Sequence, residues 1–175
     1  QPYHKFQPVG MTLDPSASTG NGITITTSAD YFDTTGSQSG GNYPSSKHIG
    51  SYLRYHNNEI EIKSVQSATQ ATGDITDELL VHLDVDALET ADTQSTVRVT
   101  FAKHGMSVGD SFTLSEAGGV GGLTANQLND THSVTEIIDD NVFVFDVGHN
   151  ATSSTIGGGS PKIVTHAATT QWSEQ

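Results

Sequence analysis

The chain has 175 residues and a mass of 18.5 kDa, with 33% hydrophobic residues and 18 glycines, so it can form one sizeable domain or two small ones but no thick helical core. Twenty acidic side chains stand against seven basic ones, a formal net charge of −13, which argues against tight nucleic-acid binding because phosphates would be repelled. The absence of cysteine excludes disulfides and thiolate metal sites, and no apolar run approaches the roughly 20 residues of a membrane-spanning helix.

The first 17 residues are predicted to form an extended arm. Pro2 and Pro8 interrupt this segment, and its aromatic residues Tyr3 and Phe6 stand apart from any periodic pattern. The segment lacks an initiator Met and the basic and apolar regions of a signal peptide. We therefore expect the chain to be a trimmed product or a segment of a longer protein.

After this arm, short runs of β-branched and alternating apolar residues predict strands separated by turns. The predicted strands are residues 23–27, 51–55, 59–65, 76–88, 133–138, 142–147 and 162–165, with further alternation from Val97 and at Phe112 and Leu114. In residues 59–65, Ile60, Ile62 and Ser64 are expected on one face and Glu59, Glu61 and Lys63 on the other. Residues 34–46, rich in Gly, Ser and Thr, are expected to be an exposed loop.

Residues 76–88 fit two patterns. Leu79, Val81, Leu83 and Val85 alternate as in a strand, whereas Leu79, Leu80 and Leu83 also fit one face of a helix. We favour the strand.

These elements predict an all-β fold, with two small antiparallel barrel-like or sandwich-like modules behind the extended N-terminal arm. The predicted boundaries are 1–17 for the arm, 18–92 for the first module, 93–166 for the second module and 167–175 for a tail or linker.

Residues that could carry chemistry do not form a recognised pattern, and no catalytic, cofactor-binding or metal-binding residue is predicted. The chain has no HxH, HExxH or GxSxG motif. Gly118–Gly122 lacks the Lys and Ser/Thr of a phosphate-binding loop and is expected to be a flexible hairpin excursion. Asp84, Asp86, Asp139 and Asp140 could bind calcium, but the calcium-loop pattern is absent and ordinary turns are the better interpretation. The eight histidines are at positions 4, 48, 56, 82, 104, 132, 149 and 166, and the two formal glycosylation sequons begin at Asn129 and Asn150.

The stretch HGMSVGD, from His104 to Asp110, forms a turn between two alternating segments. His104 and Asp110 are interpreted as turn-shaping residues and not as a catalytic pair.

Three stretches resemble tail nozzle proteins, the tail tubular protein B class of short-tailed bacteriophages. The first is TGNGITITTSADYF, continued by IGSYLRYHNNEIEIKSVQSATQATGDITDEL. The second is the HGMSVGD module, which resembles an inserted β-domain of phage virion proteins. The third is the terminal TQWSEQ. The resemblance implies a non-enzymatic virion subunit that forms a ring, as a hexamer in the nozzle case. Such a subunit contacts other tail or head-tail proteins and bounds the DNA exit channel without binding DNA specifically. Nozzle proteins are several times longer than this chain.

Two other functions stay open. A carbohydrate- or cell-surface-binding module of a phage fibre or decoration protein could stack sugars on Tyr31, Tyr43, Tyr52, Tyr55 or Trp172, although burial of most of these rings is the alternative. A wall-degrading hydrolase is disfavoured, because a pair of carboxylates can always be chosen from twenty acidic residues.

Overall fold

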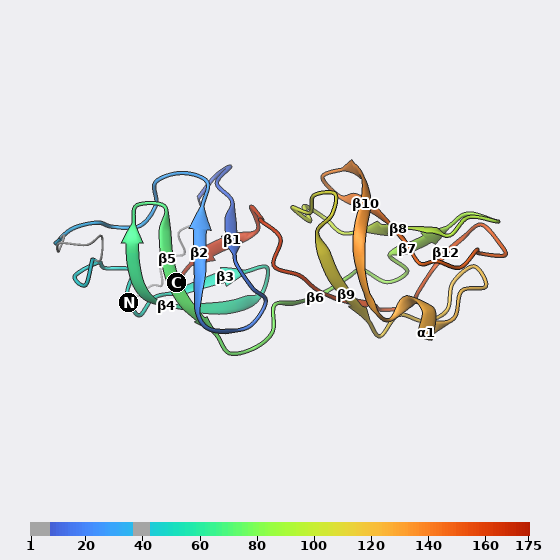
Figure 1. Ribbon diagram of the computed structural model, residues 1–175, viewed down its shortest axis with the longest axis horizontal. Coiled ribbons are helices and arrows are strands. Elements are labelled where there is room, and N and C mark those ends of the chain that lie inside the picture. Colours follow the sequence, from blue (N-terminus) through green and yellow to red (C-terminus); the bar gives the residue numbers. More distant parts are fainter. Residues whose placement is uncertain (1–7, 37–42) are drawn as a thin grey trace. The chain divides into compact units, whose positions relative to one another are not determined.

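The computed structural model describes residues 8–36 and 43–175, which divide into two compact units (Figure 1). The first unit consists of Gln1–Leu79 and Ala168–Gln175, and the inserted unit consists of Leu80–Ala167. Strands dominate both units, so the predicted all-β class is confirmed. Within the described residues, no helix is long and apolar enough to cross a membrane.

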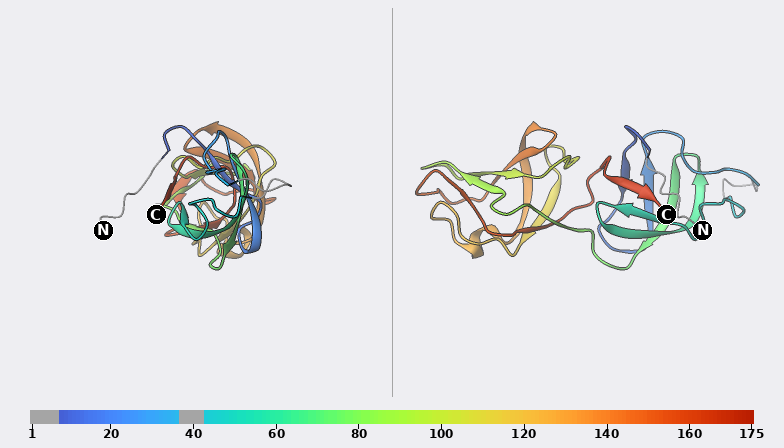
Figure 2. Two further views of the ribbon diagram at one scale, coloured as in Figure 1. Left: turned by 90° about the vertical axis from the view of Figure 1, so that its left-hand side faces the viewer. Right: turned by 180° about the vertical axis from the view of Figure 1, so that it is seen from behind.

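The first unit is a six-stranded antiparallel sheet in the order β1-β2-β5-β4-β3-β14. Its strands are β1 (Leu13–Pro15), β2 (Gly20–Thr27), β3 (Tyr52–Tyr55), β4 (Asn58–Ser67), β5 (Gln70–Ile75) and β14 (Trp172–Glu174). Leu13 and Thr169 exchange two backbone hydrogen bonds of 2.8 and 2.9 Å, which link the first strand to the segment leading into the last. The sheet is thereby nearly closed into a barrel, with β14 (red in Figure 2) beside β3.

Strand β4 shows how the alternating pattern builds the core of the first unit. Ile60 and Ile62 are fully buried, as predicted, but Val65 and not Ser64 continues the buried face. The reason is a break in the β4–β5 register between Ile62 and Ser64, since one extra residue turns the following side chains to the other face.

The inserted unit is an eight-stranded antiparallel sheet in the order β12-β7-β8-β11-β10-β9-β13-β6. Its elements are β6 (Leu80–His82), β7 (Leu88–Thr90), β8 (Thr96–Thr100), β9 (Ser111–Ser115), α1 (Ala125–Leu128), β10 (Thr131–Asp139), β11 (Val142–Asp146), β12 (Thr155–Gly157) and β13 (Lys162–Val164). Its core centres on Phe112, whose ring meets those of Phe143 and Phe145 edge to face at 5.2 and 5.4 Å. Such contacts are favourable for aromatic pairs.

The glycine-rich stretch Gly118–Gly122 is packed, contrary to the expectation of a flexible excursion. Gly121 has a positive φ of 57°, and a Cβ atom there would lie 2.0 Å from Thr90 Oγ1. Thr152 N–H donates to Gly121 O at 2.7 Å. Glycine is therefore required here both by conformation and by the close approach of a neighbouring side chain.

The prediction of one strand over residues 76–88 was wrong. Only Leu80–His82 and Leu88–Thr90 are strands, and the chain passes between the two units here. Leu79 is buried in the core of the first unit, Leu83 belongs to the core of the inserted unit, and Val85 is 72% exposed. The alternating apolar residues thus belong to two different cores.

The two units also differ from the predicted domain boundaries. Leu80 pairs with Val164 in the inserted unit, so that unit begins before residue 93. Strand β1 lies within the predicted arm, and β14 lies within the predicted tail. These short terminal strands are stabilised by pairing with partners distant in sequence, which local patterns do not reveal. The prediction for residues 1–7 and for 37–42 of the loop lies outside the described residues.

Candidate functional site

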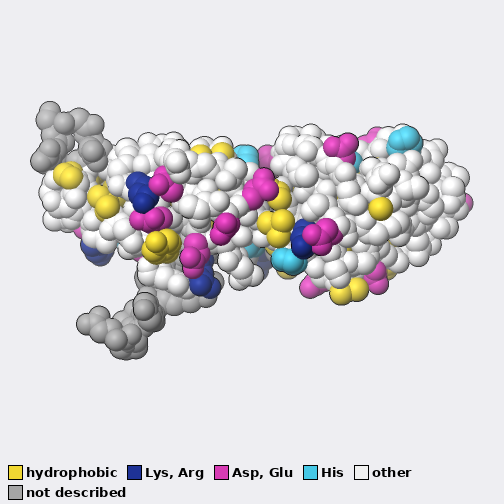
Figure 3. All heavy atoms as spheres, turned by 90° about the horizontal axis from the view of Figure 1, so that it is seen from below, with side chains coloured by type: hydrophobic (Ala, Val, Ile, Leu, Met, Phe, Trp, Pro, Cys, Tyr) yellow, Lys and Arg dark blue, Asp and Glu magenta, His cyan; other side chains and the backbone are white. Residues whose placement is uncertain are grey.

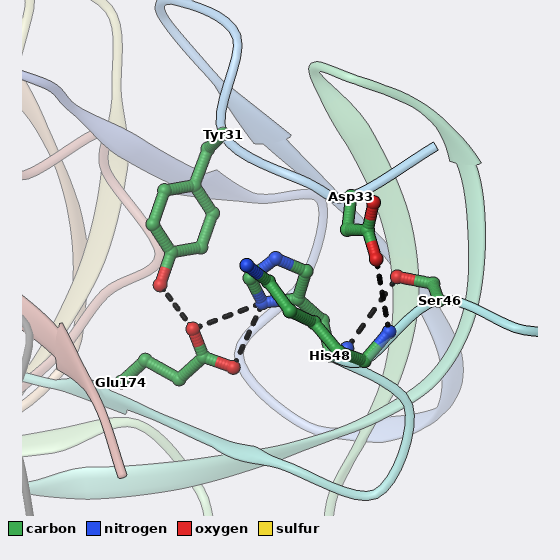
Figure 4. A network of polar contacts seen from close by, with 6 residues as sticks. Tyr31, Asp33, Ser46, His48 and Glu174 are labelled. Carbon is green, nitrogen blue, oxygen red and sulfur yellow. Dashed lines mark hydrogen bonds and ion pairs between the residues drawn. The ribbon is translucent and has the colours of Figure 1, made fainter. Parts of the chain in front are cut away.

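Three ionisable side chains meet in the interior of the first unit: Tyr31, His48 and Glu174 (Figure 4). We call them the polar cluster. Tyr31 follows β2, His48 lies in the turns before β3, and Glu174 ends β14. The cluster therefore joins the last strand of the unit to two segments more than 120 residues earlier in the chain.

Glu174 is the acceptor at the centre of the polar cluster. His48 Nδ1 lies 2.9 and 3.0 Å from the two carboxylate oxygens, and the Tyr31 hydroxyl donates to Oε2. Burial alone would raise the pKa of Glu174, but the hydrogen bonds from His48 and Tyr31 hold it below its ordinary value. Because an ionised carboxylate can only accept, Nδ1 carries a hydrogen.

Tyr31 is held in its neutral form. Burial and then the hydrogen bond to the Glu174 carboxylate raise the pKa of the phenol above its ordinary value. Its ring also meets Trp172 edge to face at 4.9 Å, and the Trp172 Nε1–H donates to Met11 O at 2.8 Å. The polar cluster and Trp172 thus attach β14 to the rest of the barrel.

The His48–Glu174 pair has the form of the histidine–carboxylate pair of acyl-transfer enzymes, in which the second ring nitrogen activates a nucleophile. Here that nitrogen, His48 Nε2, is buried and has no hydrogen-bond partner among the described residues. The rings of Tyr31 and Phe32 lie 5.1 and 5.8 Å from the imidazole ring. The contacts described for the pair are therefore ring packing and the hydrogen bond to Glu174.

Ser46 supports the turn that carries His48. Its side chain is buried, and Oγ accepts the backbone N–H of His48 at 3.4 Å. Asp33, which lies beside Ser46 in Figure 4, accepts the backbone N–H groups of Thr35 at 3.0 Å and Lys47 at 3.4 Å. Ser46 was expected in an exposed loop, but the turns that present His48 to the core bury it.

His104 and Asp110, the residues singled out in the HGMSVGD stretch, each hold a local backbone turn. The buried His104 accepts the Met106 N–H through Nδ1 at 2.8 Å, so Nε2 carries the hydrogen and donates to Asp139 O at 2.9 Å. Asp110 Oδ2 accepts the Ser107 N–H at 2.7 Å. The structure does not bring the two side chains into a common hydrogen bond.

The acidic turns considered for calcium bind backbone groups. Asp86 Oδ1 accepts the Gly159 N–H at 3.0 Å, and Asp139 Oδ1 accepts the Asn141 N–H at 2.7 Å. Across residues 8–36 and 43–175, no three His, Asp or Glu side chains gather closely enough to hold a metal ion.

The aromatic side chains proposed as sugar platforms are mostly inside the protein. Tyr55 and Trp172 are buried, Tyr31 and Tyr43 are half-buried, and Tyr52 is 43% exposed. At the first sequon, the Asn129 side chain forms hydrogen bonds of 2.8 and 3.0 Å with the backbone of Ala117, so this amide serves the fold.

Sequence reasoning missed the polar cluster because its members carry no local signal. His48 and Glu174 are 126 positions apart, and no motif links them. The one indication was Trp172, the only tryptophan of the chain, because a tryptophan in an otherwise polar tail is more often buried than exposed.

No protein-family model and no curated protein matches the chain. Among solved structures, the chain is similar to phage phi92 endosialidase, with 13% sequence identity and a TM-score of 0.42. The similarity covers 98% of this chain and 27% of that chain, so the chain spans about a quarter of that protein's length.

Proposed function

We propose that this chain is a non-catalytic structural component of a bacteriophage virion, a tail nozzle or tail tube subunit that bounds the DNA exit channel. The observation that supports this best is how the chain is divided. The stretches that resemble the nozzle chain itself, 19–32 continued by 49–79 and then 170–175, meet in the first unit, where β14 pairs with β3. The stretch that resembles an inserted virion domain lies in the separate unit between them.

The charge of the chain suits a channel wall. An acidic surface repels DNA phosphates, so DNA can move past it without being retained. Figure 3 shows acidic side chains over both units on the face drawn. His48 Nε2 is buried, and the carboxylates of Asp110 and Asp139 accept backbone N–H groups in turns. These observations support a structural role over a catalytic one.

Electron microscopy tests the proposal in two ways. The purified protein should form rings or oligomers under negative stain, and antibodies against it should label the tail of purified virions. Mobility-shift assays at low salt should show no retention of duplex DNA. A protein that stays dispersed and monomeric, with no labelling of virions, would count against the proposal.

The carbohydrate-binding alternative now depends on one ring, Tyr52, on the outer face of β3. Binding to a glycan array that is lost in Tyr52→Ala would favour it, because stacking on a sugar needs an accessible aromatic face. Trp172→Ala is unsuitable for this test, because Trp172 lies in the core.

A further inference from the structure

The charges of the inserted unit are unevenly distributed. The unit contains eleven acidic and three basic residues, yet two of its segments, 117–129 and 147–161, contain no Asp, Glu, Lys or Arg. We call these two segments the uncharged tip. In an acidic chain, a surface of this kind is where another acidic molecule can approach with the least repulsion.

The two segments of the uncharged tip form one surface. Gly118 N–H donates to Gly158 O at 2.8 Å, and Thr152 N–H donates to Gly121 O at 2.7 Å. Both α1 and β12 lie at this end of the inserted unit in Figure 1. On the face drawn in Figure 3, the same end is largely white, with acidic side chains at its margins. Glu116, Asp130 and Asp146 directly flank the two segments in the sequence, and the backbone N–H of Asp92 donates to Ser154 Oγ of the tip at 2.9 Å.

The uncharged tip also has an unused strand edge and an exposed apolar side chain. Strand β12 ends the order of the eight-stranded sheet and pairs only with β7 among the described strands. Its central residue, Ile156, is 67% exposed. Natural sheets commonly protect an exposed edge with charged residues or proline, and β12 itself, Thr155–Gly157, contains neither.

We propose that the uncharged tip is the surface through which two copies of this chain associate, with β12 and Ile156 inside the contact. A second copy is the occupant that the charges favour, because tip-to-tip packing keeps the acidic surfaces of the two copies apart. Since the same surface is used on both copies, the contact is two-fold symmetric. The inference rests on the proposed function insofar as a virion subunit must self-associate.

Light scattering and sedimentation velocity over a concentration series of the full chain test the inference. The wild-type protein is expected to form a dimer. Raising the salt from about 50 to about 500 mM should strengthen association, because it screens the repulsion between acidic copies. Ile156→Lys places two like charges across the two-fold contact and should raise the dissociation constant at least about tenfold.

Val108→Lys is the matched control, because Val108 is 65% exposed in the same unit but lies outside the uncharged tip. It makes the same change of charge and should dimerise like the wild type, as should the conservative Ile156→Val. Circular dichroism melts would show that all variants are folded.

The inference would be overturned if the wild-type chain stayed monomeric up to about 1 mM at high salt. It would also be overturned if Ile156→Lys dimerised as tightly as the wild type, or if Val108→Lys weakened the dimer as much as Ile156→Lys does. Virion labelling separates these results from the proposed function. If virions are labelled but Ile156→Lys dimerises like the wild type, only the tip contact is rejected. If Ile156→Lys weakens the dimer but virions are not labelled, only the virion role is rejected.

Discussion

Polar side chains inside the barrel of the first unit join segments that are far apart in the sequence. Glu174 is 14% exposed at its side chain, and two donors from distant segments converge on it. Hydrogen bonds to a charged group are each worth about 1.5–3 kcal/mol, and leaving a buried donor without its acceptor costs a similar amount. The stability of this unit should therefore depend strongly on this one carboxylate.

Glu174→Ala is expected to lower the free energy of unfolding of the first unit by about 2–3 kcal/mol, because His48 Nδ1 and the Tyr31 hydroxyl lose their acceptor. Glu174→Gln keeps one acceptor oxygen and should cost less. Urea unfolding followed by Trp172 fluorescence measures both. Glu59→Ala is the control, since this exposed glutamate pairs with Arg54 at the surface and its loss should cost under about 1 kcal/mol. Equal losses for Glu174 and Glu59 would contradict the role of the cluster.

His56 makes the stability of the first unit dependent on pH. Burial lowers the pKa of His56 from 6.5 to about 4, so the unfolded chain binds more protons between these values. Its contribution to stability is therefore complete above about pH 6.5 and lost as the pH falls to about 4, up to about 3 kcal/mol. Urea midpoints measured from pH 7.5 to 4 should fall in this window. In His56→Asn, which cannot titrate, the slope should be reduced; an unchanged slope would show that other groups cause it.

Among the connecting elements, the glycine-rich loop Gly118–Gly122 of the inserted unit is packed more tightly than its composition indicates. Its sequence is typical of a flexible loop, yet Gly121 approaches Thr90 and Gly122 approaches Thr152 too closely for any Cβ atom. The loop is thus fitted against β7 and the segment before β12. Its glycines are needed for this close packing as well as for their positive φ values.

Gly121→Ala is expected to destabilise the inserted unit by about 2 kcal/mol or more, because the new methyl group would overlap the Thr90 side chain and Ala resists a φ of 57°. Gly148→Ala separates the two causes, since Gly148 has a φ of 73° but nothing within 4 Å of its Cβ position. That variant should cost only about 1 kcal/mol of backbone strain. Thermal melts by circular dichroism compare them, and equal losses would mean that the loop is not tightly packed.

The buried hydrophobic side chains of residues 8–36 and 43–175 form two cores, one in each unit. The single tryptophan, Trp172, lies in the first of these. Its fluorescence therefore reports on the first unit, whereas circular dichroism reports on both. This difference makes the independence of the units measurable in the intact protein.

Phe112→Ala removes a fully packed ring from the core of the inserted unit and should destabilise that unit by about 3–5 kcal/mol. The circular dichroism transition should then split, while the midpoint of Trp172 fluorescence stays at its wild-type value. Ile25→Ala, in the core of the first unit, should shift the fluorescence midpoint instead. If both variants shift both signals equally, the chain unfolds as a single cooperative unit.

Local pattern predicted the elements whose residues alternate clearly. The strands of the β3–β4 and β10–β11 hairpins, predicted as residues 51–55, 59–65, 133–138 and 142–147, follow from this alternation. Strand β5 was not predicted by periodicity, because its buried positions carry Ala71 and Gly73. Gly73 is needed there, since a Cβ atom would lie 2.7 Å from Ile25 Cδ1, but a glycine in isolation indicates a turn.

The sequence by itself determined the all-β class and the acidic character of the chain, since both follow from composition and from period-two alternation. Only the tertiary structure decided that residues 168–175 return to the first unit, that Glu174 meets His48 and Tyr31, and that the uncharged segments 117–129 and 147–161 adjoin. The physical reason is that strand pairing and buried hydrogen bonds join residues far apart in the chain. Their partners are selected by geometry and burial and are not encoded in any local pattern.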